Sequence, residues 1–153
     1  ALPFADESFD ALVSLDVVVH LPRGEEGRAF REFHRVLKPG APLVLRAAAL
    51  DILRSRHSEF AHERQRFTAA RLRQAIEAAG FRLERLSYCQ SFLLPVALVK
   101  FRVWEPLTGA PVASGVEVPP QALNRLLQIP LEWEAKLLGA GWNLPLGQSL
   151  LVL

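Results

Sequence analysis

The feature that most limits the fold is a change of hydrophobic period on either side of Lys38-Pro39-Gly40. Before this break, apolar residues recur at steps of three and four, which predicts an amphipathic helix. After it, residues 41–46 form a short apolar run typical of a buried strand. Proline disfavours helix in the residue before it and glycine accepts a left-handed cap, so the helix must end here.

A second apolar run, residues 9–15 followed by Val17-Val18-Val19, precedes the helix and predicts a parallel strand that is buried on both faces. Strand, helix and strand in this order form a right-handed parallel crossover in nearly all proteins. Further along, Thr68 is a plausible N-cap for a second helix that Gly80 ends. Residues 81–88 then predict a strand with a bulge near Arg85, and residues 149–153 predict a terminal strand.

The region between these last two strands is less regular. Residues 92–103 predict a buried helix, residues 106–120 a loop rich in proline and glycine, and residues 121–138 a helix that Pro130 kinks or breaks. We expect one domain over residues 1–153, in which residues 92–145 form a substrate-side or covering insertion. Trp104, Trp133 and Trp142 are expected in a core or an interface.

Composition narrows the class of protein. Of the 153 residues, 50% are hydrophobic and 22% are charged, which indicates a globular domain with a sizeable core. The net charge of +2 gives no reason to expect a nucleic-acid partner. A single cysteine, Cys89, allows no intrachain disulfide, so a cytoplasmic location is expected. The apolar run 92–99 is far shorter than the roughly 20 residues of a membrane span.

Candidate functional residues follow the two expected strands. In open parallel sheets, ligands bind at the carboxyl ends of the strands. These ends are Ser14-Leu15-Asp16 for the first strand and Arg46-Ala47-Ala48 for the second. Consecutive strands of a parallel unit usually pair, so we expect the two ends to open onto one crevice.

Several motifs, taken together, resemble a known family. They are Leu2-Pro3-Phe4 with Ser8-Phe9-Asp10, Ser14-Leu15-Asp16-Val17 with His20, the segment from Phe33 to Gly40, and Ala79-Gly80-Phe81. In order and spacing they resemble the later motifs of class I S-adenosylmethionine-dependent methyltransferases, of the type 11 group, from Leu2 to Tyr88. The resemblance implies an α/β fold with a Rossmann-like, doubly wound and mostly parallel sheet, and an antiparallel last strand.

The chain also departs from that family. The glycine-rich loop after the family's first strand, and the acidic residue that ends its second, are not in the sequence. The sequence contains no methionine and starts in a loop leading to a strand, so we expect the C-terminal portion of such a domain, without its N-terminal strands. We expect this portion to bind the cofactor poorly by itself. Many relatives carry glutamate where Val19 precedes His20.

The resemblance implies methyl transfer from S-adenosylmethionine to a small-molecule acceptor. Alignment of donor and acceptor and exclusion of water would be the main tasks of the protein. Ser14, Leu15 and Asp16 are the candidate cofactor-binding residues, although Ser14 and Asp16 are equally suited to capping the next helix. His20 is the candidate base for an acceptor that must lose a proton; the alternative is a packing or capping residue.

A polar stretch between the second strand and the second helix holds the candidate acceptor-binding residues His57, His62, Arg64 and Arg66. It resembles a substrate-side lid found in some bacterial members of the family. Guanidinium groups bind carboxylate or phosphate in a bidentate manner, which suits an anionic acceptor. The alternative is a solvated basic loop. The five-residue spacing of the two histidines does not suit a metal site, and none is expected.

A non-catalytic α/β module completed by a partner chain is the alternative function. A sheet with an uncovered edge or face tends to pair or aggregate. A second copy of the chain, or another protein, would then cover it.

Overall fold

A mixed sheet of four strands organises the chain in the order β1-β2-β4-β3. The computed structural model describes residues 1–109 and 119–153. The strands are β1 (Leu12–Leu15), β2 (Leu43–Ala48), β3 (Leu86–Cys89) and β4 (Ser149–Val152). β1 and β2 are parallel, with Leu12 opposite Leu43 and Leu15 opposite Arg46. β4 is antiparallel to both β2 and β3, which confirms the α/β fold with an antiparallel last strand.

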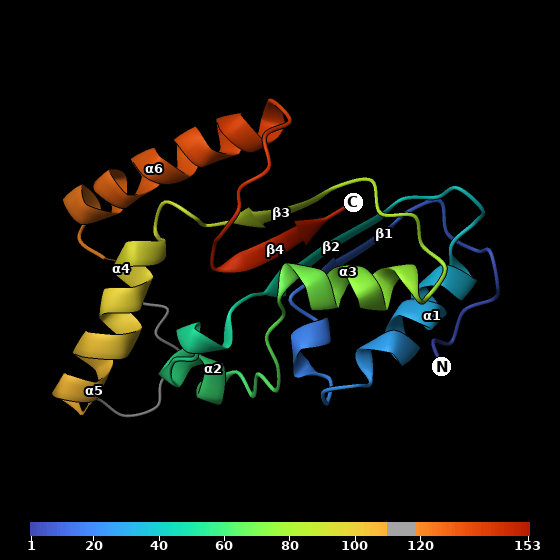
Figure 1. Cartoon of the computed structure of the whole chain (residues 1–153), viewed down its shortest axis with the longest axis horizontal. Coiled ribbons are helices and arrows are strands. Elements are labelled where there is room, and N and C mark those ends of the chain that lie inside the picture. Colours follow the sequence, from blue (N-terminus) through green and yellow to red (C-terminus); the bar gives the residue numbers. More distant parts are fainter. Residues whose placement is uncertain (110–118) are drawn as a thin grey trace.

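The two long helices that the sequence predicted are present with the expected ends. α1 (Glu26–Val36) stops at Leu37, and Gly40 follows with a φ of 78° that favours glycine. α3 (Ala69–Glu77) begins after Thr68, whose hydroxyl accepts a hydrogen bond of 3.3 Å from the Arg71 backbone N–H. Both helices lie on the same side of the sheet (Figure 1).

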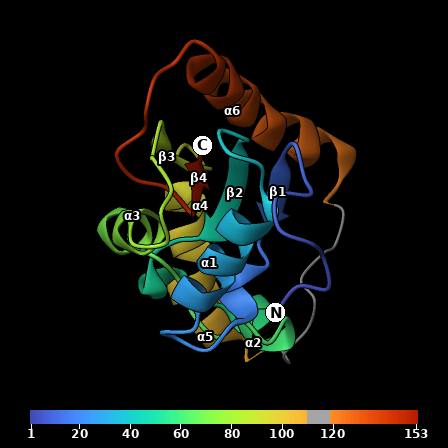
Figure 2. The same cartoon turned by 90° about the vertical axis from the view of Figure 1, so that its right-hand side faces the viewer.

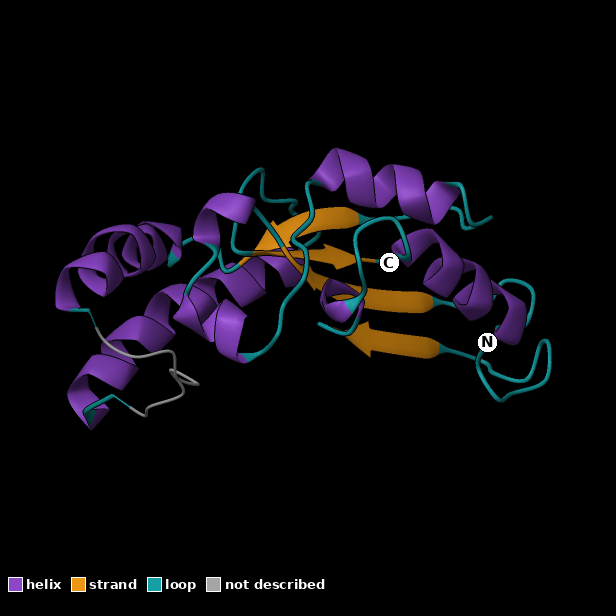
Figure 3. Cartoon of the chain, turned by 90° about the horizontal axis from the view of Figure 1, so that it is seen from below, coloured by secondary structure: helices purple, strands orange, loops and turns teal. Residues whose placement is uncertain are grey.

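The core lies between the sheet and these two helices. Leu45 and Ala47 of β2 are fully buried, because alternate residues of a strand point to the same face. They belong to a hydrophobic cluster that the helices complete with Phe30, Leu72 and Ile76. Figure 3 shows the strands side by side with helices packed along them.

The opposite face of the sheet is largely uncovered at β1. Val13 is 63% exposed and Leu15 is 53% exposed, and both lie on this face. The expectation of a strand buried on both faces is therefore wrong for this chain, because no described helix packs on this side of β1. The strand is also shorter than the expected range 9–15: it begins at Leu12, and Phe9 forms only an isolated bridge with Leu37. Val18–His20, after the strand, is a 3-10 helix.

The last helical region stands at one end of the sheet and over it (Figures 1 and 2). It contains α4 (Leu94–Val99), a π-helical turn (Lys100–Trp104), α5 (Glu105–Thr108) and the long α6 (Gln121–Gly139). Pro130 lies inside α6 and does not end it. A short 3-10 helix, Asp51–Leu53, and α2 (Arg56–Phe60) lie between β2 and α3.

Burial in this region differs from the sequence expectation. Residues 92–103 are largely helical, but only Leu94 and Ala97 of this stretch are buried. Trp104, Trp133 and Trp142 are between 61% and 66% exposed, so they are not core residues of this chain. Of the expected loop 106–120, residues 110–118 lie outside the described part, and residues 106–108 belong to α5.

The bulge expected near Arg85 is visible in the backbone hydrogen bonds. The N–H groups of Glu84 and Arg85 both donate to the Leu153 carbonyl, at 3.0 and 2.9 Å. Two residues opposite one is the pairing of a β-bulge. The regular strand β3 therefore begins only at Leu86.

Within residues 1–109 and 119–153, every helix is too short or too polar to cross a bilayer.

Candidate functional site

A cavity of about 330 Å³ lies at the carboxyl ends of β1, β2 and β3. β4 runs in the opposite direction, so its first residue reaches the same edge of the sheet. The lining includes residues from all four strand ends and from the segment after β2, among them Asp16, His20, Arg46, His57, Gln90 and Ser149. The predicted crevice between the first two strand ends therefore exists.

Asp16 and Arg46 join the ends of β1 and β2 across this cavity. The Arg46 guanidinium donates two hydrogen bonds to Asp16 Oδ2, from Nε at 2.9 Å and from Nη2. The Asp16 backbone N–H donates to the Arg46 carbonyl at 2.9 Å. The hydrogen bonds to Asp16 raise the pKa of Arg46 above its ordinary value, because they favour the charged guanidinium.

Ser14 and Leu15 are not among the residues that line this cavity. Ser14 is 4% exposed, and its hydroxyl has no hydrogen-bond partner among the described residues. The Leu15 side chain lies on the other face of the strand. A cofactor-binding role of these two residues stays a prediction.

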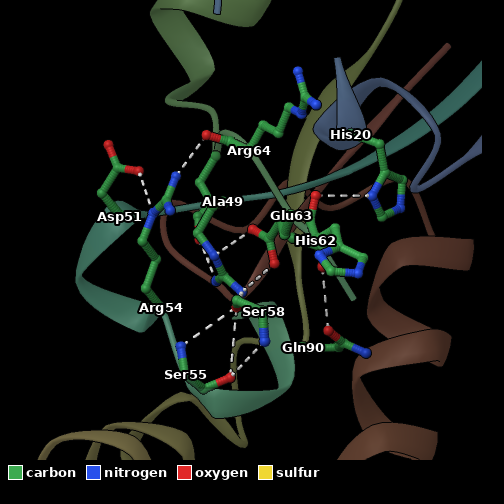
Figure 4. A network of polar contacts seen from close by, with 12 residues as sticks. His20, Ala49, Asp51, Arg54, Ser55, Ser58, His62, Glu63, Arg64 and Gln90 are labelled. Atoms are coloured by element: carbon green, nitrogen blue, oxygen red, sulfur yellow. Dashed lines mark hydrogen bonds and ion pairs between the residues drawn. The ribbon is translucent and has the colours of Figure 1, made fainter. Parts of the chain in front are cut away.

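His20 lies at the end of the 3-10 helix that follows β1, and its side chain is exposed at the cavity. Its Nδ1 lies 3.5 Å from the backbone carbonyl oxygen of His62 (Figure 4). His62 has a φ of 53°, in the left-handed region. A carbonyl near Nδ1 favours a proton on that nitrogen, which leaves Nε2 as the acceptor.

The segment after α2, which was expected to act as a lid, is hydrogen-bonded to the segment that follows β1. The backbone N–H groups of Arg64 and Gln65 both donate to the Val19 carbonyl, at 2.9 and 3.1 Å. Arg54 donates to the Arg64 carbonyl at 2.8 Å (Figure 4). The Arg64 side chain is exposed and is not part of the cavity lining.

The Arg66 guanidinium contacts other residues of the protein instead of facing solvent. Its Nε lies 2.7 Å from a carboxylate oxygen of Glu63, and the two side chains are only 9% and 8% exposed. The remaining nitrogens donate to the Ala49 carbonyl and to the Ser58 hydroxyl, both at 3.1 Å. The structure therefore gives Arg66 a role in holding the end of β2 and α2 to this segment. A contact with an acceptor stays a prediction for Arg66, as it does for His57, His62 and Arg64.

A buried polar cluster of Glu26, Gln65 and Arg71 holds the same segment from the other side. Arg71 donates to Glu26 and to the side-chain oxygen of Gln65, and it stacks 4.7 Å above the Phe67 ring. Gln65 donates to the Leu21 carbonyl at 3.0 Å. Burial alone would raise the pKa of Glu26, but the hydrogen bonds from Arg71 and from the Gly24 N–H lower it below its ordinary value.

Glu134 of α6 holds the turn at Gln90, which lines the cavity. No sequence pattern pointed to this role of Glu134. Its carboxylate accepts hydrogen bonds from the backbone N–H groups of Gln90, Ser91 at 2.7 Å and Phe92 at 3.1 Å. Glu134 is 3% exposed. Gln90 has a φ of 57°, so this turn presents three successive N–H groups to one anion.

A larger cavity of about 770 Å³ lies at the opposite, amino edge of the sheet, beside the ends of α1 and α3. Two ion pairs lie among its lining residues: Arg35 lies 2.5 Å from Asp6, and Arg82 lies 2.9 Å from Glu84. None of the residues proposed for a site from the sequence lines it. The smaller cavity is therefore the candidate site, because strand-end geometry and the polar side chains meet there.

Comparison with known proteins gives sequence matches in the first part of the chain. Residues 1–45 match a family described as "Methyltransferase domain". Sterol methyltransferase-like 1 of Botryococcus braunii is 50% identical over 40 residues, which is 26% of this chain and 10% of that protein. Probable tRNA methyltransferase 9B of Homo sapiens is 41% identical over 59 residues, 38% of this chain and 13% of that protein.

Solved structures match nearly the whole chain. A SAM dependent methyltransferase from Archaeoglobus fulgidus aligns with a TM-score of 0.50 and 15% identity, over 97% of this chain and 60% of that one. A Haloferax volcanii complex that contains the Trm112 methyltransferase activator aligns with a TM-score of 0.53 and 17% identity, over 99% and 55%. The resemblance to class I methyltransferases is confirmed.

The class I methyltransferase fold does not by itself fix the chemistry of this chain. The [4+2]-cyclase SpnF also has this fold, with a TM-score of 0.51 and 18% identity over 99% of the chain and 52% of that one. The chain spans between 10% and 13% of the length of the curated relatives above. Its reaction must therefore be argued from the cavity.

Proposed function

We propose that this chain contributes the acceptor side of an active site for S-adenosylmethionine-dependent methyl transfer to a small molecule. The observation that carries the proposal is the cavity at the carboxyl edge, which brings Asp16, His20 and His57 together. S-adenosylmethionine, when bound, supplies a methyl group on a sulfonium that is already a strong electrophile. The protein must then mainly align the acceptor and exclude water.

The residues of the cavity suit part of this cofactor. Asp16 and Arg46 offer a carboxylate and a guanidinium at the end of two strands, which suits the charged amino-acid end. Ser14 and Leu15 of β1 directly precede Asp16 and stay proposed cofactor contacts. The described lining of the cavity contains no glycine, and its other carboxylate, Glu63, is paired with Arg66. The adenosine end would need other residues of the protein.

His20 is the proposed base. With Nδ1 beside the His62 carbonyl, Nε2 can take the proton of a hydroxyl or amine acceptor. His57 lines the same cavity and is a proposed acceptor contact. His62 contributes its backbone carbonyl to the contact with His20, and Arg66 holds the surrounding segment in place. These two residues would therefore affect acceptor binding by setting the shape of the cavity.

Isothermal titration of the full-length protein with S-adenosylhomocysteine, combined with a methyl-transfer assay over a panel of small acceptors, tests the proposal. We expect His20→Gln to lower kcat by about 10²-fold or more while the Kd of S-adenosylhomocysteine stays constant, because general base catalysis contributes about 10²–10⁴-fold. Absence of cofactor binding by the natural protein would contradict the proposal. Equal loss of kcat and of cofactor affinity in His20→Gln would remove His20 as the base.

A module that a partner completes is the second candidate, and the free edge of β1 favours it. β1 ends the strand order, and its Val13 and Leu15 side chains are more than half exposed. Such an edge is a template for pairing with a second copy or another protein. Light scattering of the full-length protein discriminates the candidates, since a monomer that binds the cofactor contradicts an obligate partner. We keep the cytoplasm as the expected location for both.

A further inference from the structure

The helical segment from α4 to α5 carries apolar residues on both of its sides. Its inner side packs on Leu53 through Leu94 and Ala97. Its outer side carries a row of apolar residues at steps of three and four, which are between 51% and 78% exposed: Val96, Val99, Val103 and Leu107. A helix that is apolar all round is normally buried in a core or in a membrane. The outer row is therefore suited to burial but is open to solvent.

α6 has a similar row. Leu126, Ile129 and Trp133 follow each other at steps of three and four and are between 53% and 63% exposed, whereas Glu134 on the inner side is 3% exposed. Both helical segments stand at the same end of the sheet (Figures 1 and 2). Single exposed apolar residues are common, but contiguous ones mark an interaction site. We call the two rows together the open helical surface.

The charges around these rows are mostly positive. Residues 94–108 and α6, which the structure describes in full, carry four exposed basic side chains and one exposed acidic side chain: Lys100, Arg102, Arg125 and Lys136, against Glu132. The other two carboxylates are used inside the protein. Glu105 accepts a hydrogen bond of 3.1 Å from the Arg56 backbone N–H, and Glu134 holds the turn at Gln90. The open helical surface is therefore complementary to an anionic partner.

Two of the basic side chains lie beside aromatic rings. Lys100 Nζ is 5.8 Å from the centre of the Phe101 ring, and Lys136 Nζ is 5.4 Å from that of Trp133. At a membrane surface, aromatic rings lie at the level of the headgroups while lysine extends its ammonium group toward the phosphates. Lysine is depleted in the interfaces between proteins. These pairs therefore favour a lipid surface over a protein partner.

We propose that the open helical surface docks the protein on an anionic lipid surface. The apolar rows lie at the boundary between headgroups and acyl chains, and the four basic side chains contact the anionic headgroups. The docking goes beyond the proposed function and does not depend on it. Phe101 of the same helical segment lines the cavity at the carboxyl edge, so docking holds this cavity next to the lipid.

The experiment is flotation of the full-length protein with vesicles of phosphatidylcholine alone and of phosphatidylcholine mixed with phosphatidylserine. Val99→Glu places a carboxylate in the apolar row, and Arg102→Gln removes one positive charge. Val13→Glu on β1 is the matched control for the first variant, since Val13 is 63% exposed and Val99 is 60% exposed. Arg28→Gln on α1 is the control for the second, since Arg28 is also exposed. Circular dichroism and thermal unfolding check that each variant is folded.

We expect the natural protein to bind the mixed vesicles about tenfold or more tightly than phosphatidylcholine alone, because several basic residues contribute. Val99→Glu should weaken binding to the mixed vesicles about tenfold or more, because it removes an apolar contact and adds repulsion. Arg102→Gln should weaken it about fivefold, which corresponds to about 1 kcal/mol for one basic residue at an anionic surface. The two controls should change binding less than about twofold, because charges beyond the Debye length are screened.

Equal binding to both kinds of vesicle, or binding to neither, would overturn the proposal. Losses in the controls as large as those in the variants would do the same. If the protein ignores vesicles and Val99→Glu abolishes its self-association in light scattering, a second copy covers this surface and the proposal fails. If Val99→Glu does not fold, Arg102→Gln decides, and unchanged binding to the mixed vesicles overturns the proposal. The Kd of S-adenosylhomocysteine should be equal in Val99→Glu and the natural protein, so the proposed function is tested separately.

Discussion

The two faces of the sheet differ in how they are built. On one face, Leu45 and Ala47 are fully buried against α1 and α3. On the other, Val13 and Leu15 are more than half exposed, and Arg46 ends the parallel pair with its guanidinium at the cavity. The two faces alternate residue by residue along the same strands. The covered face therefore contains most of the buried apolar side chains of the sheet, and the open face carries the ion pair at the candidate site.

The polar contacts follow the same division. Inside the structure, Arg66 and Arg71 each meet a nearly buried carboxylate, Glu63 or Glu26, with side chains no more than 8% exposed. On the open face, Asp16 and Arg46 remain about 40% exposed, and both side-chain hydrogen bonds between them end on Asp16 Oδ2. The ion pairs that fix the loops thus have a nearly buried carboxylate, whereas the pair at the cavity is open to solvent.

The largest expected effect tests the covered face. Leu45→Ala should lower the free energy of unfolding by about 3 kcal/mol, because it removes a fully buried side chain and leaves a cavity. Val13 of β1 is exposed on the opposite face of the sheet. Val13→Ala should therefore change the free energy of unfolding by less than about 0.5 kcal/mol. Urea denaturation of both variants measures the difference. Equal losses would show that the two faces are equally packed in the folded protein.

The next effect concerns the buried cluster around Glu26. Arg71→Met should lower the free energy of unfolding by about 2 kcal/mol. This loss is smaller than for breaking a fully buried ion pair, because the Arg71 side chain is 22% exposed. Glu26 has a folded pKa below its ordinary value of 4.5, so its stabilising effect is complete above pH 4.5 and disappears as the pH falls through the folded pKa.

Urea denaturation between pH 7 and pH 3 therefore gives a second comparison for this cluster. The natural protein should lose stability over this range, and Arg71→Met should lose less. Parallel pH profiles of the two proteins would rule out the linkage.

A smaller effect tests the α6 contact. Glu134→Gln should lower the free energy of unfolding by about 1 kcal/mol, because a neutral amide oxygen accepts weaker hydrogen bonds than a carboxylate does. Hydrogen exchange at the Gln90, Ser91 and Phe92 amides should accelerate. Glu132→Gln is the matched control on the same helix, since Glu132 is exposed and accepts a hydrogen bond of 2.7 Å from Gln128 of α6. Similar exchange in both variants would contradict the assigned role of Glu134.

The smallest change in stability is expected for Val13→Lys at the free edge. The Val13 side chain is already exposed, so the free energy of unfolding should change by less than about 0.5 kcal/mol. A lysine on an edge strand opposes pairing, so self-association measured by light scattering should fall if a second copy covers this edge. Unchanged association would place that contact elsewhere on the protein.

Much of the fold was predictable because its signals are local. The helix ended before Pro39-Gly40, Thr68 capped α3, and the parallel order of β1 and β2 followed from the crossover. The burial of the first strand was not predictable, because apolar residues show that a strand is suited to burial but not which elements cover it. The exposed tryptophans were misjudged for the same reason.

The candidate site was predictable in part. The strand-end rule pointed to Asp16 and Arg46, and the family resemblance added His20. The register that places Leu15 opposite Arg46 would also have suggested the Asp16–Arg46 pair. The role of Arg66 had a signal that the prediction did not use, namely Glu63 three residues before it. Glu134 had none, since it bonds to Gln90 across 44 residues of sequence. Only tertiary structure brings them together.

The contact between Glu134 and the turn at Gln90 also has a mechanical consequence. A rigid helix of 19 residues is attached by one carboxylate to a wall of the cavity. A rotation or shift of α6 must therefore move Gln90 or break these bonds. By thermodynamic reciprocity, a molecule that changes the ligand affinity of the cavity by holding α6 must itself bind more tightly or more weakly, by the same factor, when that ligand is present.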